Sequence, residues 1–78
     1  MTFEEISKLY HAAPFRPFEI ILTSGRHVRV DHPKFMALSP DEDVVVVFES
    51  DGHLTIDVPM VVALKEFRNG ATTRKRKR

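Results

Sequence analysis

Two prolines three residues apart, in the segment Pro14-Phe15-Arg16-Pro17-Phe18, constrain this chain more than any other feature. Neither proline has an N–H to donate, and both hold φ near the value of an extended segment, so a helix cannot continue through them. In an extended segment with about three residues per turn, Phe15 and Phe18 project from the same edge. We therefore expect a helix before Pro14, a sheet after Pro17, and the two phenylalanines as the contact that holds the helix on the sheet.

The residues before these prolines have the pattern of one amphipathic helix. Thr2 and Glu5 have the spacing of a capping box, in which each side chain satisfies a backbone N–H of the first turn. Apolar side chains then recur at helical spacing and predict a helix over residues 3–12. These apolar residues are Phe3, Ile6, Leu9, Tyr10 and Ala13. A helix of about three turns is marginal by itself, so it must pack on the sheet.

Six short segments after Pro17 have the composition or the alternation of strands. Turns at Ser24-Gly25 and Asp51-Gly52 join two pairs of them as hairpins, because glycine supplies the positive φ that such turns need. Pro33 cannot donate to a ladder, so it interrupts the sheet after the second strand. Pro59 ends the fifth strand and permits a short turn. The expected strands are residues 19–23, 26–31, 35–38, 44–48, 53–58 and 62–67.

This order of elements predicts a mainly β chain of the α+β class with one N-terminal helix. The economical closure is a five- or six-stranded antiparallel small barrel or curled sheet, with the helix across one opening. The alternative is a helix packed on an open antiparallel sheet. We expect residues 1–69 to form a single globular domain, with its strands within 18–67, and residues 70–78 to form a flexible basic tail.

Length and composition limit what can stabilise this domain. Its 78 residues provide one core, and a chain this short is marginally stable unless a disulfide, a metal or association adds to it. The sequence has no cysteine, which excludes disulfides and thiolate metal sites and leaves association. The first residues are charged, unlike a signal peptide, and no apolar run approaches the ~18 residues of a membrane span. We expect a soluble cytoplasmic protein without membrane contact.

Candidate catalytic and metal-binding residues are few. Two histidines and two aspartates face outward on separate expected strands, and imidazole and carboxylate suit zinc, but no compact spacing such as H-x-x-x-H brings them together. They are His27, Asp31, His53 and Asp57. The serines occupy capping or turn positions, the three glycines form no phosphate-binding loop, and the carboxylates of Asp41-Glu42-Asp43 lie in a polar turn. We expect no enzymatic activity, no cofactor and no metal; an enzyme with an outward His/Asp metal site is a remote alternative.

The formal net charge of +1 is divided unevenly along the chain. Residues 1–73 carry seven Lys/Arg against all eleven Asp/Glu, a balance of −4, whereas residues 74–78 carry +5. These five residues are Arg74, Lys75, Arg76, Lys77 and Arg78. They can neutralise nucleic-acid phosphates with a steep salt dependence but without sequence specificity. Solubility, a proteolytically frayed end and a localisation signal stay open as other interpretations.

One expected strand is apolar on both of its faces. It contains Val44, Val45, Val46, Val47 and Phe48. Such a strand needs cover on both sides. In one interpretation the helix and the barrel interior provide this cover, so that the segment is core. In the other, an outer face or an edge pairs with a second copy of the chain, and we expect such a homo-oligomer to gather several basic tails.

Several motifs within residues 2–67 resemble those of a family of small uncharacterised bacterial proteins. They are the N-terminal helix, Ala13-Pro14-Phe15-Arg16-Pro17-Phe18, Gly25-Arg26, His32-Pro33-Lys34-Phe35 and Leu38-Ser39-Pro40. The spacing of these motifs is fairly specific. This resemblance implies no known activity.

The order of elements is also similar to that of the Sm-like small β-barrels. The shared features are a helix, the segment Leu22-Thr23-Ser24-Gly25-Arg26, Phe35 ten residues after the glycine, an apolar strand, a hairpin and a short turn at 59–61. This resemblance implies an SH3/Sm-like barrel, in a family that forms rings and binds single-stranded RNA. The Asp/Asn pair and the Arg-Gly of the uridine pocket in that family are missing here, so only the architecture is implied.

Together these features predict a small non-enzymatic binding module that self-associates. Nucleic acid or an acidic protein partner would be contacted through the basic tail. The alternative is a structural or regulatory protein–protein interaction domain with no role in nucleic-acid binding.

Overall fold

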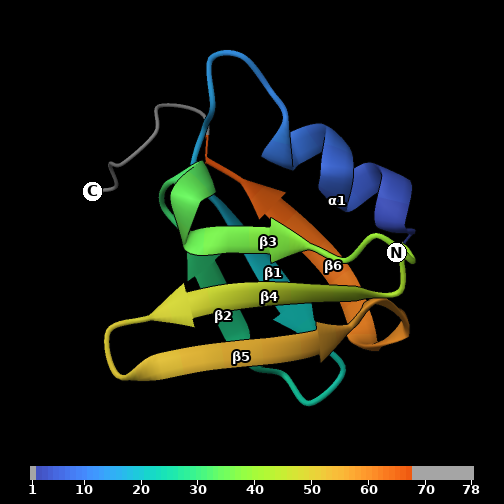
Figure 1. Ribbon diagram of the computed structural model, residues 1–78. Helices are drawn as coiled ribbons and strands as arrows, with labels where there is room; N and C mark the ends of the chain where they lie inside the picture. The colour runs from blue at the N-terminus through green and yellow to red at the C-terminus, as the bar shows by residue number, and fades with distance from the viewer. Residues whose placement is uncertain (1, 68–78) are drawn as a thin grey trace.

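The computed structural model describes residues 2–67, so the expectation of a flexible tail at residues 70–78 lies outside the described residues. Within the described range one α-helix and six strands follow one another (Figure 1). They are α1 (Phe3–Tyr10), β1 (Phe18–Leu22), β2 (His27–Val30), β3 (Met36–Leu38), β4 (Val44–Glu49), β5 (Gly52–Asp57) and β6 (Val61–Glu66). Two short 3-10 helices, η1 (Pro33–Phe35) and η2 (Val58–Met60), precede β3 and β6. The prediction of a mainly β chain with one N-terminal helix is confirmed.

The six antiparallel strands form two three-stranded sheets. The strand order is β2-β1-β6 in one sheet and β3-β4-β5 in the other. In Figure 1 the second sheet lies in front of the first, and the strands of the two sheets cross at a steep angle. The chain passes from one sheet to the other at Pro33, which opens η1 and cannot donate to a ladder. The interruption at Pro33 is confirmed. The expectation was a small barrel or a curled sheet, and its barrel form is corrected, since the strands of residues 2–67 form two sheets and do not close into a barrel.

Helix α1 begins with the predicted capping box and ends earlier than predicted. The Glu5 N–H donates to Thr2 Oγ1 at 3.3 Å, and the Thr2 N–H donates to Glu5 Oε1 at 3.1 Å. The hydrogen bond from the Thr2 backbone holds the pKa of the Glu5 carboxyl below its usual range. The helix ends at Tyr10 rather than at residue 12, because His11 leaves the helical region and caps it by donating its N–H to the Ser7 carbonyl at 2.9 Å.

The core lies between the inner faces of the two sheets. Helix α1 contributes one fully buried side chain to it, that of Ile6. The rings of Phe15 and Phe18 lie 5.9 Å apart, and Phe18 is fully buried, which is consistent with the expected contact between the helix exit and the sheet. The rest of the buried core consists of Ile20, Val28, Val30, Met36, Val45, Val47, Ile56, Val58 and Val61. Both sheets therefore depend on one shared apolar interior.

The first hairpin has the predicted turn. Gly25 has a φ of +91°, and its N–H donates to the Leu22 carbonyl at 2.8 Å. The Leu22 N–H in turn donates to the Arg26 carbonyl at 2.9 Å. Glycine is favoured here because residues that have a Cβ atom rarely adopt a positive φ.

Candidate interaction surface

Strand β4 presents two different faces, because its side chains alternate across the sheet. Val45 and Val47 face the core and are 0% and 1% exposed. Val44 and Val46 are half-buried on the opposite side, where Phe48 is 47% exposed. Val45 and Val47 therefore belong to the core of the single chain, and Val44, Val46 and Phe48 lie on its outward side. The expectation that the segment 44–48 supplies an interface stays a prediction.

The strand beside β4 extends this outward face. Ala37 of β3 lies opposite Val46 in the register of the two strands. Phe35, in η1 just before β3, is 44% exposed and lines the same cavity as Phe48. We call this set the apolar face; it consists of Phe35, Ala37, Val44, Val46 and Phe48.

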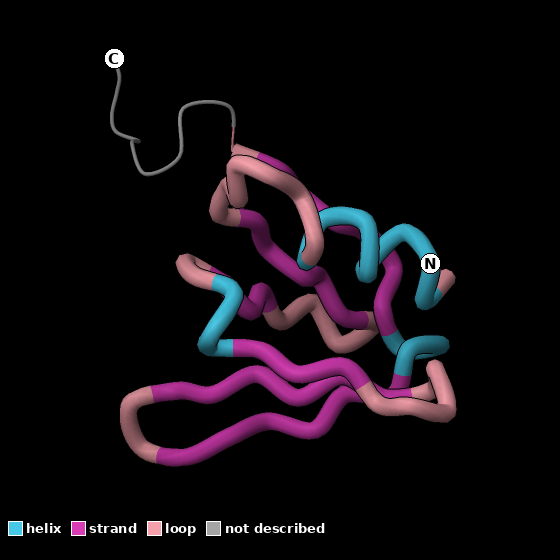
Figure 2. Tube along the Cα trace, turned by 45° about the horizontal axis from the view of Figure 1, so that its top comes forward, coloured by secondary structure: helices cyan, strands magenta, loops and turns pink. Residues whose placement is uncertain are grey.

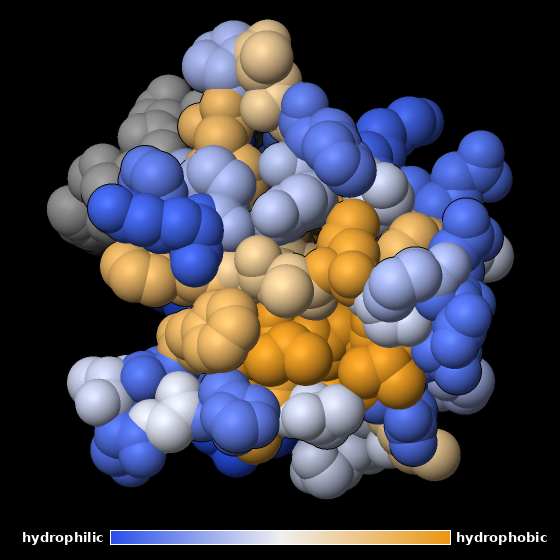
Figure 3. Space-filling model, viewed as in Figure 1, coloured by the Kyte–Doolittle hydropathy of each residue, from blue (hydrophilic) through white to orange (hydrophobic). Residues whose placement is uncertain are grey.

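The apolar face is open to solvent. In Figure 3 apolar side chains gather over β3 and β4 on the side turned to the viewer. Figures 1 and 2 show that α1 does not lie over β4 or β5, so the helix leaves this side of the sheet uncovered. Single apolar side chains are normal on a protein surface, whereas a contiguous group of them is typical of an interaction site.

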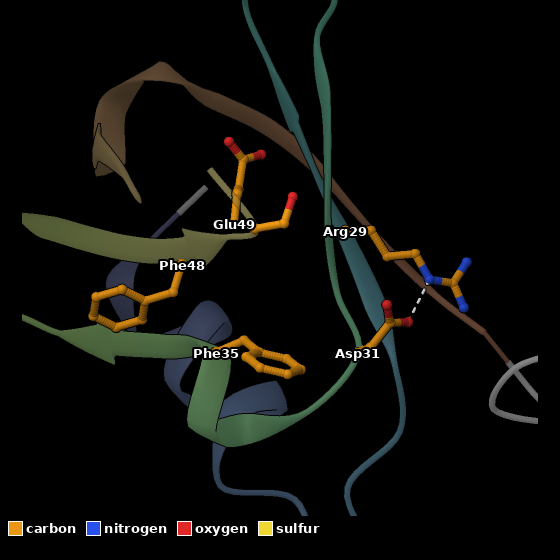
Figure 4. Close-up of a pocket in the computed structure, with 6 residues that line it drawn as sticks. Arg29, Asp31, Phe35, Phe48 and Glu49 are labelled. Atoms are coloured by element: carbon orange, nitrogen blue, oxygen red, sulfur yellow. Dashed lines mark hydrogen bonds and ion pairs between the residues drawn. The ribbon is translucent and has the colours of Figure 1, made fainter. Parts of the chain in front are cut away.

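A groove of about 400 Å³ opens at one end of the apolar face (Figure 4). Its walls come from β2 and the residue after it, from η1, and from the end of β4 and its hairpin. We call it the end groove; it is lined by Arg29, Asp31, Phe35, Phe48, Glu49 and Ser50. Phe35 and Phe48 thus belong both to the apolar face and to the end groove.

The charged side chains of the end groove already form ion pairs. Arg29 Nε donates to Asp31 Oδ1, and Arg26 Nη2 donates to Glu49 Oε2 at 3.1 Å. The side chains of both pairs are between 35% and 59% exposed, and pairs with this exposure contribute about 0–1 kcal/mol. In Figure 4 the Arg29 guanidinium lies on the far side of Asp31 from both phenyl rings. The open part of the groove therefore combines aromatic rings with carboxylates, which suits a cation better than an anion.

The four side chains considered as metal ligands lie apart. His27 Nδ1 lies 3.0 Å from Glu19 Oε1, and the His53 ring lies 6.2 Å from the ring of Phe48. Asp31 is part of the end groove, and Asp57 pairs with Val44 at the other end of β4. Among residues 2–67 no three histidine, aspartate or glutamate side chains are grouped so that they could hold a metal ion. The same part of the chain contains no helix of the length and apolarity that a membrane span requires.

The basic residues 74–78 lie outside the described residues, but the place from which the chain leaves toward them is known. The Phe67 N–H donates to the Pro17 carbonyl at 3.1 Å. The Arg29 guanidinium carbon lies 4.4 Å from the centroid of the Phe67 ring, and Lys65 Nζ lies 5.4 Å from it. Arg29 also lines the end groove, so the described chain ends beside a residue of that groove.

The end groove could not be recognised in the sequence from local patterns. Asp31 has only the features of an outward strand residue, and Phe35 follows a proline-containing interruption. The useful signal is the turn at residues 39–43. Pairing the chain outward from this turn brings residues 36–38 opposite 45–47, and the next step brings Phe35 near Phe48.

Comparison with known proteins found no match among family models, curated proteins or solved structures.

Proposed function

We propose that this protein is a small non-enzymatic binding module that self-associates through its apolar face and contacts nucleic acid through residues 74–78. The apolar face is the observation that carries the proposal. Val46 is only half-buried and Phe48 is 47% exposed on a strand whose other side is core. A domain of this size has little stability to spare, and pairing with a second copy would remove more apolar surface from water.

We propose a contact between identical apolar faces. A face on one subunit can pair with the same face on another across a two-fold axis, and larger rings are possible where the contact is between different surfaces. An SH3/Sm-like arrangement is the finer architecture that we propose for each subunit. The support for it is η2, which stands directly before the last strand, and the bend at Pro33, which separates β2 from β3.

Charge supports the assignment of nucleic-acid contact to the C-terminal segment. Residues 2–67 carry six Lys/Arg against eleven Asp/Glu, a balance of −5, so this part of the chain repels a polyanion. Self-association would bring several basic segments together and raise their effective concentration. Anisotropy of a labelled single-stranded oligonucleotide over a salt series distinguishes this proposal from the alternative of a protein–protein interaction domain, in which no salt-dependent binding is expected.

Sedimentation of the full chain at micromolar concentration tests the self-association. We expect a dimer or a larger assembly of the 9.0 kDa chain. Val46→Glu should reduce the mass to that of the monomer and leave the circular dichroism spectrum unchanged. Val62→Glu is the matched control, because it places the same charge on β6 at a position that is 54% exposed, and it should not change the mass. A wild-type chain that sediments as a monomer even at high concentration would refute the proposal.

A further inference from the structure

We infer that the end groove binds a cationic side chain, and that the chain's own C-terminal segment, residues 68–78, supplies it. This inference rests on the proposed function in one respect, since it takes the same basic segment to be the polyanion contact. It adds an intramolecular binding site that competes for that segment. Phe35 and Phe48 lie at the edge of the apolar face, so the inference requires that their groove side stays open when Ala37, Val44 and Val46 contact a second copy.

The chemistry of the end groove fits a lysine or an arginine. A cation within about 6 Å of a ring centroid is attracted by the negative face of the ring. Phe35 and Phe48 both line the groove and are 44% and 47% exposed, although in Figure 4 the Phe48 ring points away from Asp31 and Glu49. Asp31 and Glu49 also line the groove, and a carboxylate accepts charge-assisted hydrogen bonds from a cation. The molecule already uses this kind of contact at Phe67, where the guanidinium carbon of Arg29 lies 4.4 Å from the ring centroid.

The two arginines at the groove leave room for a further cation. The Arg29 guanidinium lies over Phe67 and beyond Asp31, away from the rings of Phe35 and Phe48 (Figure 4). An ionised carboxylate has two oxygens with about four positions for hydrogen-bond donors, so a carboxylate that is paired with one arginine can accept a second cation. The existing pairs are exposed and weak, and they exchange with solvent and other cations readily.

The position of Phe67 makes the chain's own segment the natural occupant. The segment starts beside Arg29, a residue that lines the groove, and its eleven residues can span up to about 36–40 Å when extended. A short tether of this kind holds its residues near the groove at an effective concentration in the millimolar range, so weak contacts suffice. The charges are also opposite in sign, because residues 68–78 carry +6 and residues 2–67 carry −5.

Docking would regulate contact with a polyanion. The same lysines and arginines cannot face the groove and a nucleic acid at once, so the two states compete. If the segment is docked for about nine-tenths of the time, the apparent affinity for a polyanion falls by about tenfold.

A spin label at the end of the segment tests the inference in the full chain. The sequence has no cysteine, so Arg78→Cys provides a single attachment site and retains five of the six basic charges of residues 68–78. We expect paramagnetic broadening of the backbone amides of Asp31, Phe48, Glu49 and Ser50 at low salt. It should disappear at about 1 M salt, where the Debye length is about 3 Å.

Two charge-matched double variants identify the cause of the broadening. Asp31→Asn with Glu49→Gln removes two carboxylates from the groove and should reduce the broadening at least about fivefold, as expected when most docked molecules are released. Asp41→Asn with Glu42→Gln removes the same charge from the exposed turn between β3 and β4, and it should change nothing. Circular dichroism confirms that each variant is folded. Equal loss in both variants, or broadening spread evenly over the surface, would overturn the inference.

A mixed sample separates the chain's own segment from that of another copy. Isotope-labelled chains without a spin label are mixed with spin-labelled chains without the isotope, and we expect no broadening at the groove. Broadening there would assign the groove to a neighbouring chain and overturn the intramolecular assignment. A chain that self-associates as proposed but shows no broadening in the first experiment refutes this inference alone, whereas a monomer with groove-specific broadening refutes the proposed self-association alone.

Discussion

The two sheets enclose one core, but their outer faces differ in how they are completed. On the sheet β2-β1-β6, Glu19 stands opposite Arg29 on one neighbouring strand and opposite Lys65 on the other. Its carboxylate also lies 3.0 Å from the ring nitrogen of His27. On the sheet β3-β4-β5, the corresponding central position holds Val46, with an alanine opposite it on β3. The first face is charged, with a carboxylate placed between cations of both neighbouring strands, and the second offers apolar side chains without cover.

This difference locates the interface. A face whose charges have partners on neighbouring strands gains little from a second surface, whereas an apolar face is stabilised when it is removed from water. Val62 of β6 and Met60 just before this strand are more exposed than any side chain of the apolar face, yet exposed apolar residues are common on a protein surface. The contiguous group on β3 and β4, rather than the most exposed residue, therefore marks the proposed contact.

The largest effect should come from exchanging a valine on the inner side of β4. Val45→Glu places a carboxylate without a partner in the core, at a cost of several kcal/mol, which is comparable to the whole stability of a small domain, about 5–15 kcal/mol. We expect circular dichroism to show an unfolded chain, whereas Val46→Glu, one residue later, stays folded. If Val45→Glu melted like the wild type, the assignment of Val45 to the inner side of β4 and of Val46 to the outer side would be wrong.

A smaller loss is expected at the hairpin of the charged sheet. Gly25 has a φ of +91°, and a Cβ added to it would meet no atom within 4 Å, so Gly25→Val costs backbone strain but creates no clash. Such strain is of order 1–3 kcal/mol. Urea unfolding measures it, and Gly25→Asn should cost less because asparagine tolerates a positive φ. The mass of the assembly should not change, since this hairpin lies in the other sheet. If the Gly25→Val chain were monomeric, the hairpin would have to contribute to the interface.

The two strands β2 and β4 show why some faces could be predicted from the sequence and others could not. In β2, Val28 and Val30 alternate with polar residues, so the buried side follows from the pattern, and both valines are buried. In Val44–Val47 every residue is apolar, so the pattern has no period from which the buried pair could be read. Only the pairing with β3 and β5 shows that Val45 and Val47 face the core.

Long-range geometry explains what else the sequence could not predict. The direction that the chain takes after Pro33 decides between a closed barrel and two sheets. A local sequence pattern does not predict this direction. The end groove combines Asp31, Phe35 and Phe48, and their approach depends on the register of β3 and β4 rather than on any motif. The turns, the capping box and the order of the elements along the chain were predictable because each depends on a few neighbouring residues.

The smallest effect is expected on the charged face itself. Glu19→Gln keeps the shape of the side chain but leaves Arg29 and Lys65 without the opposite charge between them. We expect it to lower the free energy of unfolding by about 0.5–1 kcal/mol at low salt, in the range of partly exposed ion pairs. The loss should shrink at about 1 M salt. Salt screens both the attraction that Glu19 exerts in the wild type and the repulsion between Arg29 and Lys65 in the variant. Urea unfolding at two salt concentrations measures both values. Sedimentation of the same variant should give the wild-type mass, because no residue of the apolar face is changed. A Glu19→Gln chain that dissociates would place the charged face in the interface, and the contrast between the two faces would no longer identify the contact.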